Sequence, residues 1–502
     1  MATLSLAVIL AENARRRPEK TALIEGERRL TFAEVWRQAL AQAGALAGLG
    51  VAPGDRIALM APNTAEFPLA YYAVAAAGGV VVPVHLLLSA PEVEHVLRDS
   101  GATLLLVHPA QAETGRAAAE ATGVRVVTLG EEFDKLAANA EPLRSYVTRA
   151  ADDPAVVFYT SGTTGVPKGA VLSHFNLVMN ATVNAFDAND IRPDDIALGA
   201  LPLFHAFGQT VSMNSTWRAG ATLVLLPRFD AARAIELMVA EKVNTIHGVP
   251  TMFVSLAAAA AAAPALPELR VCISGGASLP VAVLERFEAA FGARIYEGYG
   301  LSETSPTATV NQPCFGTKAG TIGHPLWGVD VEIARAEVEG RVELLPPGEL
   351  GEVVIRGHNV FSGYLGRPEA TAQAVVDGWF RTGDLGTKDE DGFLRIVDRK
   401  KDVIIRGGYN VYPREVEEVL MRHPGIAQVA VIGLPDELHG EEVCAVVVPA
   451  PGASRDAAAL TAWSKEHLGR HKYPRRVEFT DALPLGPSMK VLKRELRTQY
   501  AG

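Results

Sequence analysis

A run of glycine and hydroxyl residues that ends in a lysine follows an apolar stretch of the chain. Residues 155–158 are apolar, and residues 159–169 then read YTSGTTGVPKG. Glycines let backbone N–H groups converge on an anion, hydroxyls donate further hydrogen bonds, and Lys168 adds a positive charge. The spacing is not that of a P-loop, because Pro167 and Gly169 stand where that motif needs a glycine and a hydroxyl residue. The run predicts a phosphate-binding loop, with a solvated surface turn as the alternative.

The segments around this loop alternate between short apolar runs and alanine-rich stretches of helical periodicity. The apolar runs are residues 56–60, 80–84, 104–107, 124–129 and 222–226. They are continuously apolar, as expected for strands covered on both faces, so they predict an α/β fold of parallel sheets with helices on both sides. Prolines and glycines interrupt the longest apolar stretch, at 67–84. It predicts a helix, a glycine break and a buried strand, and no integral membrane segment.

The pattern changes after about residue 340. Strands separated by Gly and Asp turns are expected at residues 348–356, 392–397 and 403–406, and they form a small β-rich subdomain. The charged run DRKKD at 398–402 then interrupts the apolar pattern. A compact series follows: a helix opened by Pro413, strands at 428–433 and 443–449, a helix near 457–468 and a strand near 476–480. We therefore predict a large N-terminal domain over 1–398 and a small α+β C-terminal domain over 403–502.

Composition excludes several classes of protein. The chain has 502 residues and a formal net charge of -10, so the molecule has no general electrostatic attraction to nucleic acid. Its three cysteines lie far apart in the sequence, which argues against a disulfide scaffold or a cysteine-based zinc module. The first basic residues come after the apolar N-terminal stretch, the reverse of a secretory signal. These features predict a cytoplasmic protein.

The loop at 159–169 resembles the signature of the adenylate-forming superfamily, which contains acyl-CoA synthetases, peptide-synthetase adenylation domains and luciferase. Other motifs of that superfamily follow in order over nearly the whole chain. They are LPLFHAFG at 201–208, GGA at 275–277, YGLSET at 299–304, TGD at 382–384, Asp398–Arg399, GGYN at 407–410 and Lys490. The resemblance implies a large N-terminal domain and a mobile C-terminal domain, joined by a hinge at 399–402 in which Lys401 absorbs the backbone rotation.

The resemblance also implies a set of nucleotide-binding residues. The β- and γ-phosphates of ATP would lie against Thr160, Ser161, Gly162, Thr163, Thr164 and Lys168. Glu303 would hold Mg²⁺, since that cation prefers oxygen ligands beside phosphate, and Thr304 would lie close to the α-phosphate. Adenine would lie between Tyr299 and the backbone near Gly276 and Ala277, and the ribose would bind Asp384 and Arg399. Taken alone, Glu303 is compatible with a solvated loop, Tyr299 with a core aromatic, and Asp384 with a turn.

Three further roles follow from the resemblance. Lys490 would bridge the attacking carboxylate and the α-phosphoryl group, although Met489 replaces the usual glycine before it and makes Lys493 a weaker candidate. His205 would gate the acyl and CoA tunnels, with a core histidine as the alternative. Gly407 and Gly408 would line the path of the CoA thiol in the second step.

These residues predict an ATP-dependent fatty acid–CoA ligase that forms an acyl adenylate with Mg²⁺ and then transfers the acyl group to CoA. The apolar pocket segments favour a medium- or long-chain acid, and Gly298 stands where malonate-activating relatives carry an arginine. The alternative is a stand-alone adenylation enzyme that loads an aryl, short-chain or amino acid onto CoA or a carrier protein. A luciferase-like monooxygenase and a non-catalytic nucleotide-binding protein are less favoured. The expected partners are the acid, ATP and CoA; a carrier protein is a weaker expectation, and a homodimer is left open.

Overall fold

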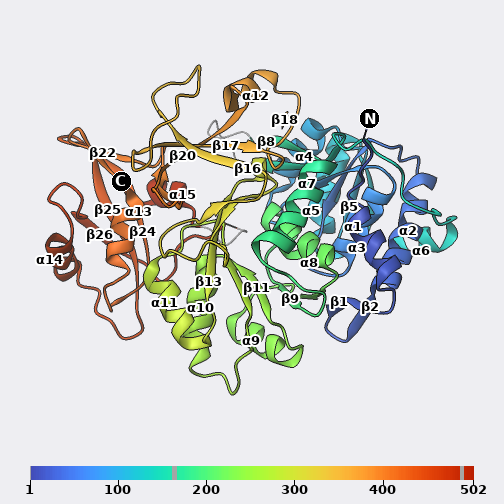
Figure 1. Ribbon diagram of the computed structural model, residues 1–502, viewed down its shortest axis with the longest axis horizontal. Coiled ribbons are helices and arrows are strands. Elements are labelled where there is room, and N and C mark those ends of the chain that lie inside the picture. The colour runs from blue at the N-terminus through green and yellow to red at the C-terminus, as the bar shows by residue number, and fades with distance from the viewer. Residues whose placement is uncertain (1, 161–166, 487–490, 502) are drawn as a thin grey trace.

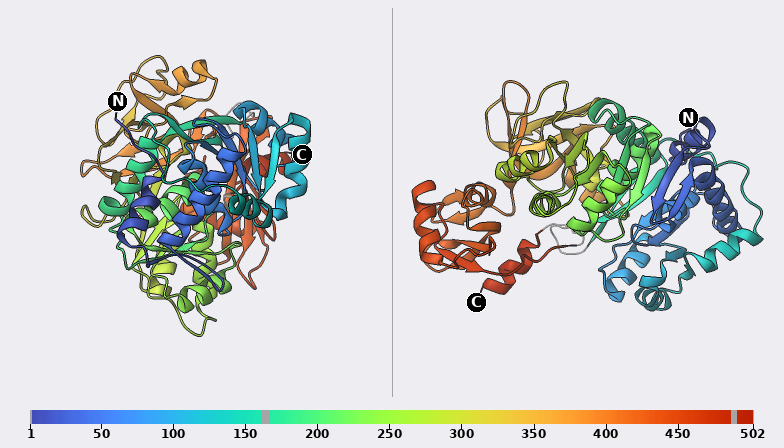
Figure 2. Two further views of the ribbon diagram at one scale, coloured as in Figure 1. Left: turned by 90° about the vertical axis from the view of Figure 1, so that its right-hand side faces the viewer. Right: turned by 90° about the horizontal axis from the view of Figure 1, so that it is seen from below.

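The computed structural model describes residues 2–160, 167–486 and 491–501. Figure 1 shows the chain from its blue N-terminal part to a red C-terminal lobe. In a view from below, the small lobe lies at one end of the molecule and the blue sheet at the other (Figure 2). Within the described ranges, no helix combines the length and the apolar character needed to cross a membrane.

Two large sheets form the N-terminal part. The first has the order β18-β8-β7-β4-β3-β5-β6, with β3 (Arg56–Met60), β4 (Val80–Pro83), β5 (Leu104–Val107), β6 (Arg125–Thr128), β7 (Pro154–Thr160), β8 (Lys168–Ser173) and β18 (Gly363–Tyr364). The second has the order β15-β14-β13-β12-β11-β9-β10-β1-β2, with β1 (Thr21–Glu25), β2 (Arg28–Thr31), β9 (Ile196–Gly199), β10 (Thr222–Leu225), β11 (Thr245–Gly248), β12 (Val271–Ser274), β13 (Ile295–Gly300), β14 (Thr307–Val310) and β15 (His324–Pro325).

The helices of this part connect and cover the strands. They are α1 (Val8–Arg16), α2 (Phe32–Gly48), α3 (Glu66–Ala76), α4 (Ala90–Ser100), α5 (Ala112–Thr122), α6 (Glu131–Asn139), α7 (His174–Val183), α8 (Ser215–Ala219), α9 (Ala231–Ala240), α10 (Pro250–Ala260), α11 (Val281–Phe291) and α12 (Pro368–Ala374). The expected helix, glycine break and strand of residues 67–84 are confirmed as α3 and β4. Gly78 lies between them at φ 76°, a backbone conformation that residues with a side chain rarely adopt.

The expectation of parallel sheets holds for the sheet centres and for the β6 edge of the first sheet, and is wrong at the other edges. Strands β3, β4, β5 and β6 pair in parallel, and so do β9, β10, β11 and β12. Strands β7, β8 and β18 are antiparallel, as are β13, β14 and β15. The segments that join β7 to β8 and β13 to β14 are too short for a crossover helix, so these neighbours must run in opposite directions. The first of these connections contains the predicted phosphate loop.

Two smaller sheets complete the fold. The β-rich subdomain contains β16 (Val329–Ala334), β17 (Gly351–Gly357), β19 (Val375–Val376), β20 (Trp379–Lys388) and β21 (Leu394–Arg399). The C-terminal lobe contains β22 (Ile404–Arg406), β23 (Tyr409–Val411), β24 (Ile426–Asp436), β25 (Gly440–Pro449) and β26 (Arg476–Phe479), with α13 (Pro413–Leu420), α14 (Ala457–His467) and α15 (Lys493–Tyr500). The α/β class with a small α+β C-terminal lobe is confirmed. The strand expected at 403–406 is β22, which pairs with β23 and β25 in the lobe, so its assignment to the β-rich subdomain was wrong. The sheet of the lobe starts after the charged run 398–402.

Candidate active site

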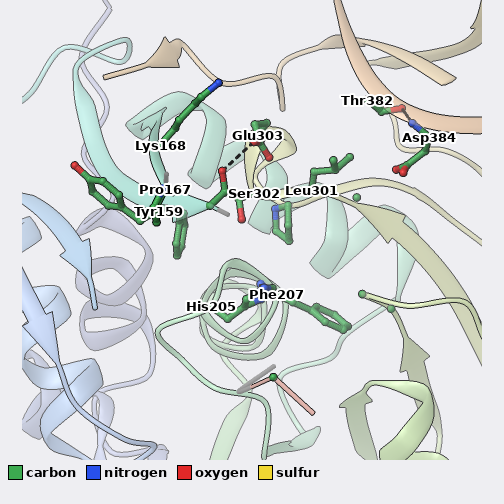
Figure 3. A pocket seen from close by; sticks show the side chains of 18 of the residues that line it. Tyr159, Pro167, Lys168, His205, Phe207, Leu301, Ser302, Glu303, Thr382 and Asp384 are labelled. Carbon is green, nitrogen blue, oxygen red and sulfur yellow. Dashed lines mark hydrogen bonds between the residues drawn. The ribbon is translucent and has the colours of Figure 1, made fainter. Parts of the chain in front are cut away.

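A cavity of about 1800 Å³ lies where the ends of β7, β12 and β13 meet β20, β21 and the C-terminal lobe. Figure 3 shows Glu303 between Lys168 on one side and Asp384 on the other, with His205 and Phe207 on the wall below them. Because the carboxyl ends of neighbouring parallel strands meet at one edge of a sheet, residues from distant motifs converge there. The structure therefore gathers in one place most of the expected residues that it describes.

Glu303 is held at the end of β7 by two hydroxyl groups. Its Oε1 accepts a hydrogen bond from the Tyr364 hydroxyl at 2.9 Å and one from Thr160 Oγ1 at 3.4 Å. Lys168 Nζ lies 5.4 Å from the centre of the Tyr364 ring. Burial, followed by the Glu303 carboxylate, raises the pKa of Tyr364 far above its usual value, so Tyr364 remains a hydrogen-bond donor. These contacts fix the Glu303 carboxylate beside the phosphate-loop strands.

The surroundings of Glu303 suit a divalent cation. The residue is only 7% exposed and lines the cavity, yet no ion pair with it occurs among the residues that the structure describes. A buried carboxylate is costly without a compensating charge, and oxygen ligands next to phosphate are what Mg²⁺ binds. The donor set present, a carboxylate with neighbouring hydroxyls, therefore fits Mg²⁺.

Asp384 and Tyr299 form the opposite side of the cavity. The Tyr299 hydroxyl donates to Asp384 Oδ2 at 2.5 Å, and Arg399 Nε lies 3.4 Å from Asp384 Oδ1. Burial and the nearby carboxylate raise the pKa of Tyr299 well above its usual value, so it acts as a donor to Asp384. A carboxylate at 5% exposure that faces a cavity can accept hydrogen bonds from a ligand with paired hydroxyls.

A buried ion pair supports the turn that carries Asp384. Arg381 Nη2 lies 2.5 Å from Glu352 Oε2, and both side chains are less than 10% exposed. Glu352 Oε1 accepts a hydrogen bond from the Gly383 N–H at 3.0 Å, and the Asp384 N–H donates to Thr382 Oγ1 at 3.0 Å. Gly383 has φ 72°, so a side chain at this position would be strained. Sequence analysis missed Glu352 and Arg381, because they lie in ordinary strand sequence and only the β17–β20 pairing brings them together.

Phe207 begins the buried helical turns η3 (Phe207–Asn214), and His205 lies two residues before them; both line the cavity. The Phe207 N–H donates to His205 Nδ1 at 3.3 Å, which places the proton of a neutral imidazole on Nε2. A Cβ built on Gly275 would lie 3.1 Å from the Phe207 ring, so a side chain at this position would require the ring to shift slightly. The structure places His205 in the wall of the cavity, not in the hydrophobic core.

Several expected residues are not in the cavity wall. The cavity is lined by Gly276 but not by Ala277, Thr304 or Gly408. The Thr304 side chain is fully buried, and its hydroxyl accepts from the Leu301 N–H at 2.8 Å and donates to the Pro306 carbonyl at 2.5 Å. Its hydroxyl therefore hydrogen-bonds the backbone of its own turn, and the expected place of Thr304 close to the α-phosphate stays a prediction. Ala277 is exposed, and Gly408 lies in the exposed β22–β23 turn.

Other expected residues fall outside the described ranges. They are Ser161, Gly162, Thr163 and Thr164 of the loop and Lys490 of the C-terminal lobe. The described residues on either side of 487–490 do line the cavity, namely 484–486 and 491–492, and Leu485 pairs with Val491. Lys493, the weaker candidate, forms an ion pair with Glu417 at 2.7 Å inside the lobe.

Tyr364 was also missed from the sequence. It lies on the short strand β18, which pairs with β8 beside the loop, with Tyr364 opposite Ala170. A single tyrosine in the run FSGYL gives no local signal of a role, and its contact with Glu303 spans 61 positions of sequence.

Comparison with known proteins identifies two family regions. Residues 10–365 match the model described as AMP-binding enzyme, and residues 415–490 match the model described as AMP-binding enzyme C-terminal domain. Together they cover most of the chain and fall on either side of the charged run 398–402.

Full-length relatives act on different acids. The chain is 42% identical over 489 residues to feruloyl-CoA synthase from an Amycolatopsis species, which covers 97% of both chains. It is 36% identical over 530 residues to the long-chain-fatty-acid–CoA ligase of Bacillus subtilis, covering 98% of this chain and 94% of that protein. Such identities over whole chains establish a common family. Because the relatives are named for different acids, they do not identify the acid that this chain uses.

Solved structures agree with the fold. The ATP-bound structure of MatB from Rhodopseudomonas palustris is 34% identical, covers 99% of each chain and has a TM-score of 0.91. The apo structure of the same protein has a TM-score of 0.81. The overall arrangement described above is thus more similar to the ATP-bound form.

Proposed function

The chain belongs to the AMP-binding enzyme family of AMP-forming acid–thiol ligases, and on this premise we propose that it joins a medium- or long-chain fatty acid to CoA. The family reaction has two steps. The carboxylate first attacks the α-phosphorus of ATP and displaces pyrophosphate to give an acyl adenylate. The CoA thiol then attacks the acyl carbon, loses its proton, and displaces AMP.

In this proposal the residues of the cavity wall bind different parts of ATP and its Mg²⁺. Lys168 and Thr160 face the phosphates of ATP, and Asp384 accepts hydrogen bonds from the ribose hydroxyls. Glu303 holds Mg²⁺, which when bound neutralises part of the charge on the phosphates. No side-chain nucleophile is required, because ATP supplies the reactive anhydride and the protein supplies positioning and charge.

The apolar end of the cavity supports the choice of acid. Phe204, Phe207, Val211, Ile273 and Val310 line it, and the described cations of the cavity wall belong to the loop or to the strands and turn around Asp384 and the lobe junction. A second carboxylate at this end would be buried without a counter-charge, which is unfavourable. A hydrocarbon tail meets no such penalty, so a fatty acid fits better than a dicarboxylate.

An aryl acid is the second candidate. Gly275, Gly276, Gly298 and Gly300 line the cavity, and the Phe207 ring packs directly against Gly275. An aromatic ring in the cavity wall can stack on a planar acid, and feruloyl-CoA synthase is among the relatives of this chain.

A panel of acids tests the proposal. Octanoate, palmitate, ferulate, benzoate and malonate would be compared by pyrophosphate release at saturating ATP, with and without CoA. We expect the highest kcat/KM with octanoate or palmitate and the formation of the matching thioester. Preference for ferulate would favour the aryl candidate, and pyrophosphate release with no consumption of CoA would indicate a carrier protein as acceptor.

A larger side chain at position 211 should lower the maximum chain length of the acids that the enzyme accepts. Val211 lines the cavity and is 1% exposed, so a Val211→Phe side chain has to project into the acyl space. Overpacking costs about 1 to 3 kcal/mol, so kcat/KM for palmitate should fall by about 5- to 150-fold while that for hexanoate changes little. Gly276 is a less suitable position, because its φ of 80° would strain any side chain. Val211→Ala is the matched control and should not exclude palmitate; equal losses for both acids in Val211→Phe would refute the assignment.

A further inference from the structure

A buried charge pair joins the C-terminal lobe to the strand that carries Tyr299. Arg414, at the start of α13, places Nη2 at 3.9 Å from Glu297 Oε1 on β13. The side chains are 9% and 3% exposed. Glu297 precedes Tyr299 by two positions, so this contact lies next to the nucleotide site but outside the cavity wall. None of the motifs in the sequence pointed to either residue.

Arg414 makes further contacts to the N-terminal part. Its Nη1 donates to the Ile396 carbonyl on β21 at 2.5 Å, and its backbone N–H donates to Asp398 Oδ2 at 3.0 Å. On the neighbouring helix α11, which borders the orange lobe in Figure 1, Arg286 donates to the Met421 carbonyl at 3.1 Å. Arg414 is thus the charged residue through which the first turn of α13 contacts both β13 and β21.

The pair is not saturated with hydrogen bonds. Glu297 Oε1 also accepts from the Leu279 N–H at 3.0 Å, whereas Glu297 Oε2 and Arg414 Nη2 have no hydrogen-bond partner. Glu418 and Arg395 are the other charged groups close to Glu297, and burial raises the pKa of Glu297 to about 7 against the opposing effect of Arg414. A buried ion pair adds little net stability, because desolvation of the two charges offsets their attraction. Removing one partner is strongly destabilising, because the other charge then stays buried without compensation. Such a pair favours one lobe position without holding it permanently.

The lobe contributes residues to the cavity wall. Leu483 and Leu496 pack into the lobe's own core with β24 and β25, while residues 484–486 and 491–492 line the cavity. The position of these cavity-lining residues therefore depends on the position of the lobe.

We propose that Arg414 and Glu297 are positioning residues that hold the C-terminal lobe over the ATP site for acyl-adenylate formation. The inference rests on the proposed function. The pair touches neither ATP nor acid, so its loss should affect the rate of the first step more than the binding of ATP. The second step involves no carboxylate activation by Lys490, so the rate of thioester formation should be retained.

The test uses four variants of the full chain. Glu297→Gln removes the carboxylate with little change in shape, and Arg414→Gln removes the guanidinium together with its hydrogen bond to the Ile396 carbonyl. The double variant removes both groups. Arg422→Gln is the matched control, because Arg422 follows the same helix but is exposed. For each variant, kcat and KM for ATP would be measured by pyrophosphate exchange, and thioester formation would be measured from pre-made acyl adenylate and CoA.

We expect Arg414→Gln to lower kcat for exchange by about 10- to 100-fold, because the Glu297 carboxylate left unpaired in the interface disfavours this position of the lobe. KM for ATP should stay within about threefold, and thioester formation should persist. The double variant should be no slower than Arg414→Gln alone, because the two groups act on each other. If Arg414→Gln fails to fold, Glu297→Gln and the double variant provide the same comparison.

Two results would overturn the inference. One is an exchange rate in Arg414→Gln equal to that of Arg422→Gln. The other is additive losses in the double variant with equal loss of both half-reactions. If the unaltered protein shows no exchange with any acid of the panel, the proposed function itself fails, which is a distinct outcome.

Discussion

Replacing Lys490 with alanine is expected to lower acyl-adenylate formation by about 10²- to 10³-fold, the range typical of removing one preorganised donor. Negative charge from the carboxylate and the α-phosphoryl group meets in this transition state, so an ammonium group contributes most there. Lys490 itself lies outside the described residues, but residues on both sides of it line the cavity. Pyrophosphate exchange measures this step. Thioester formation from pre-made adenylate should continue.

Lys493→Ala is the matched control for this experiment. Lys493 begins α15 and is paired with Glu417 at 2.7 Å, so its ammonium group already has a counter-ion within the lobe. The variant should lose some stability and little adenylation activity. A larger effect on exchange from Lys493→Ala than from Lys490→Ala would mean that Met489 marks a shift in register and that Lys493 is the catalytic lysine.

Lys401→Pro is expected to separate the two half-reactions in the opposite way. We propose that residues 399–402 are a hinge and that the lobe takes a second orientation for thioester formation. Proline fixes φ and restricts the preceding Lys400, so rotation at this position should be lost. Adenylation should remain within about tenfold, while thioester formation should fall by about 10²-fold or more, because the lobe can no longer reposition the reacting groups.

The structure explains why position 401 suits this test. The Lys400 N–H donates to the Gly383 carbonyl at 2.9 Å, and the Asp402 N–H donates to the Arg399 carbonyl at 2.9 Å, so the flanking residues are tied while β22 starts only at Ile404. Lys401→Ala, which keeps the backbone free to rotate, is the control and should retain both steps. Equal loss of both steps in Lys401→Pro, with an unchanged circular dichroism spectrum, would argue against a hinge.

Much of the fold could be predicted from the sequence, because secondary structure depends largely on local patterns. The continuous apolar runs became parallel strands of the two large sheets, and the glycines after residue 76 ended a buried helix. The division between β21 and β22 was visible as a run of charges. The order of the strands and the antiparallel edges were not predictable, since pairing between distant segments has no local signature.

The site residues could be predicted from the sequence where they belong to a motif of neighbouring residues. Thr160, Lys168, Glu303 and Asp384 all lie in recognisable runs, and the structure brings them to one cavity. Their surroundings were decided only by tertiary structure. Glu303 is positioned by Tyr364, and the turn before Asp384 is supported by Glu352, because a hydrogen bond needs two groups that the chain brings together from distant positions.

The same reason accounts for the residues whose surroundings were not anticipated. Thr304 has the right type and spacing for a phosphate contact, yet the folded turn uses its hydroxyl for the Leu301 and Pro306 backbone. Arg414 and Glu297 look like ordinary surface charges in the sequence and become a buried pair only when the lobe packs against β13. The sequence alone thus determined which residue types were available for chemistry. Packing between distant segments decided which atoms face the cavity, because burial and hydrogen-bond partners are properties of the folded chain.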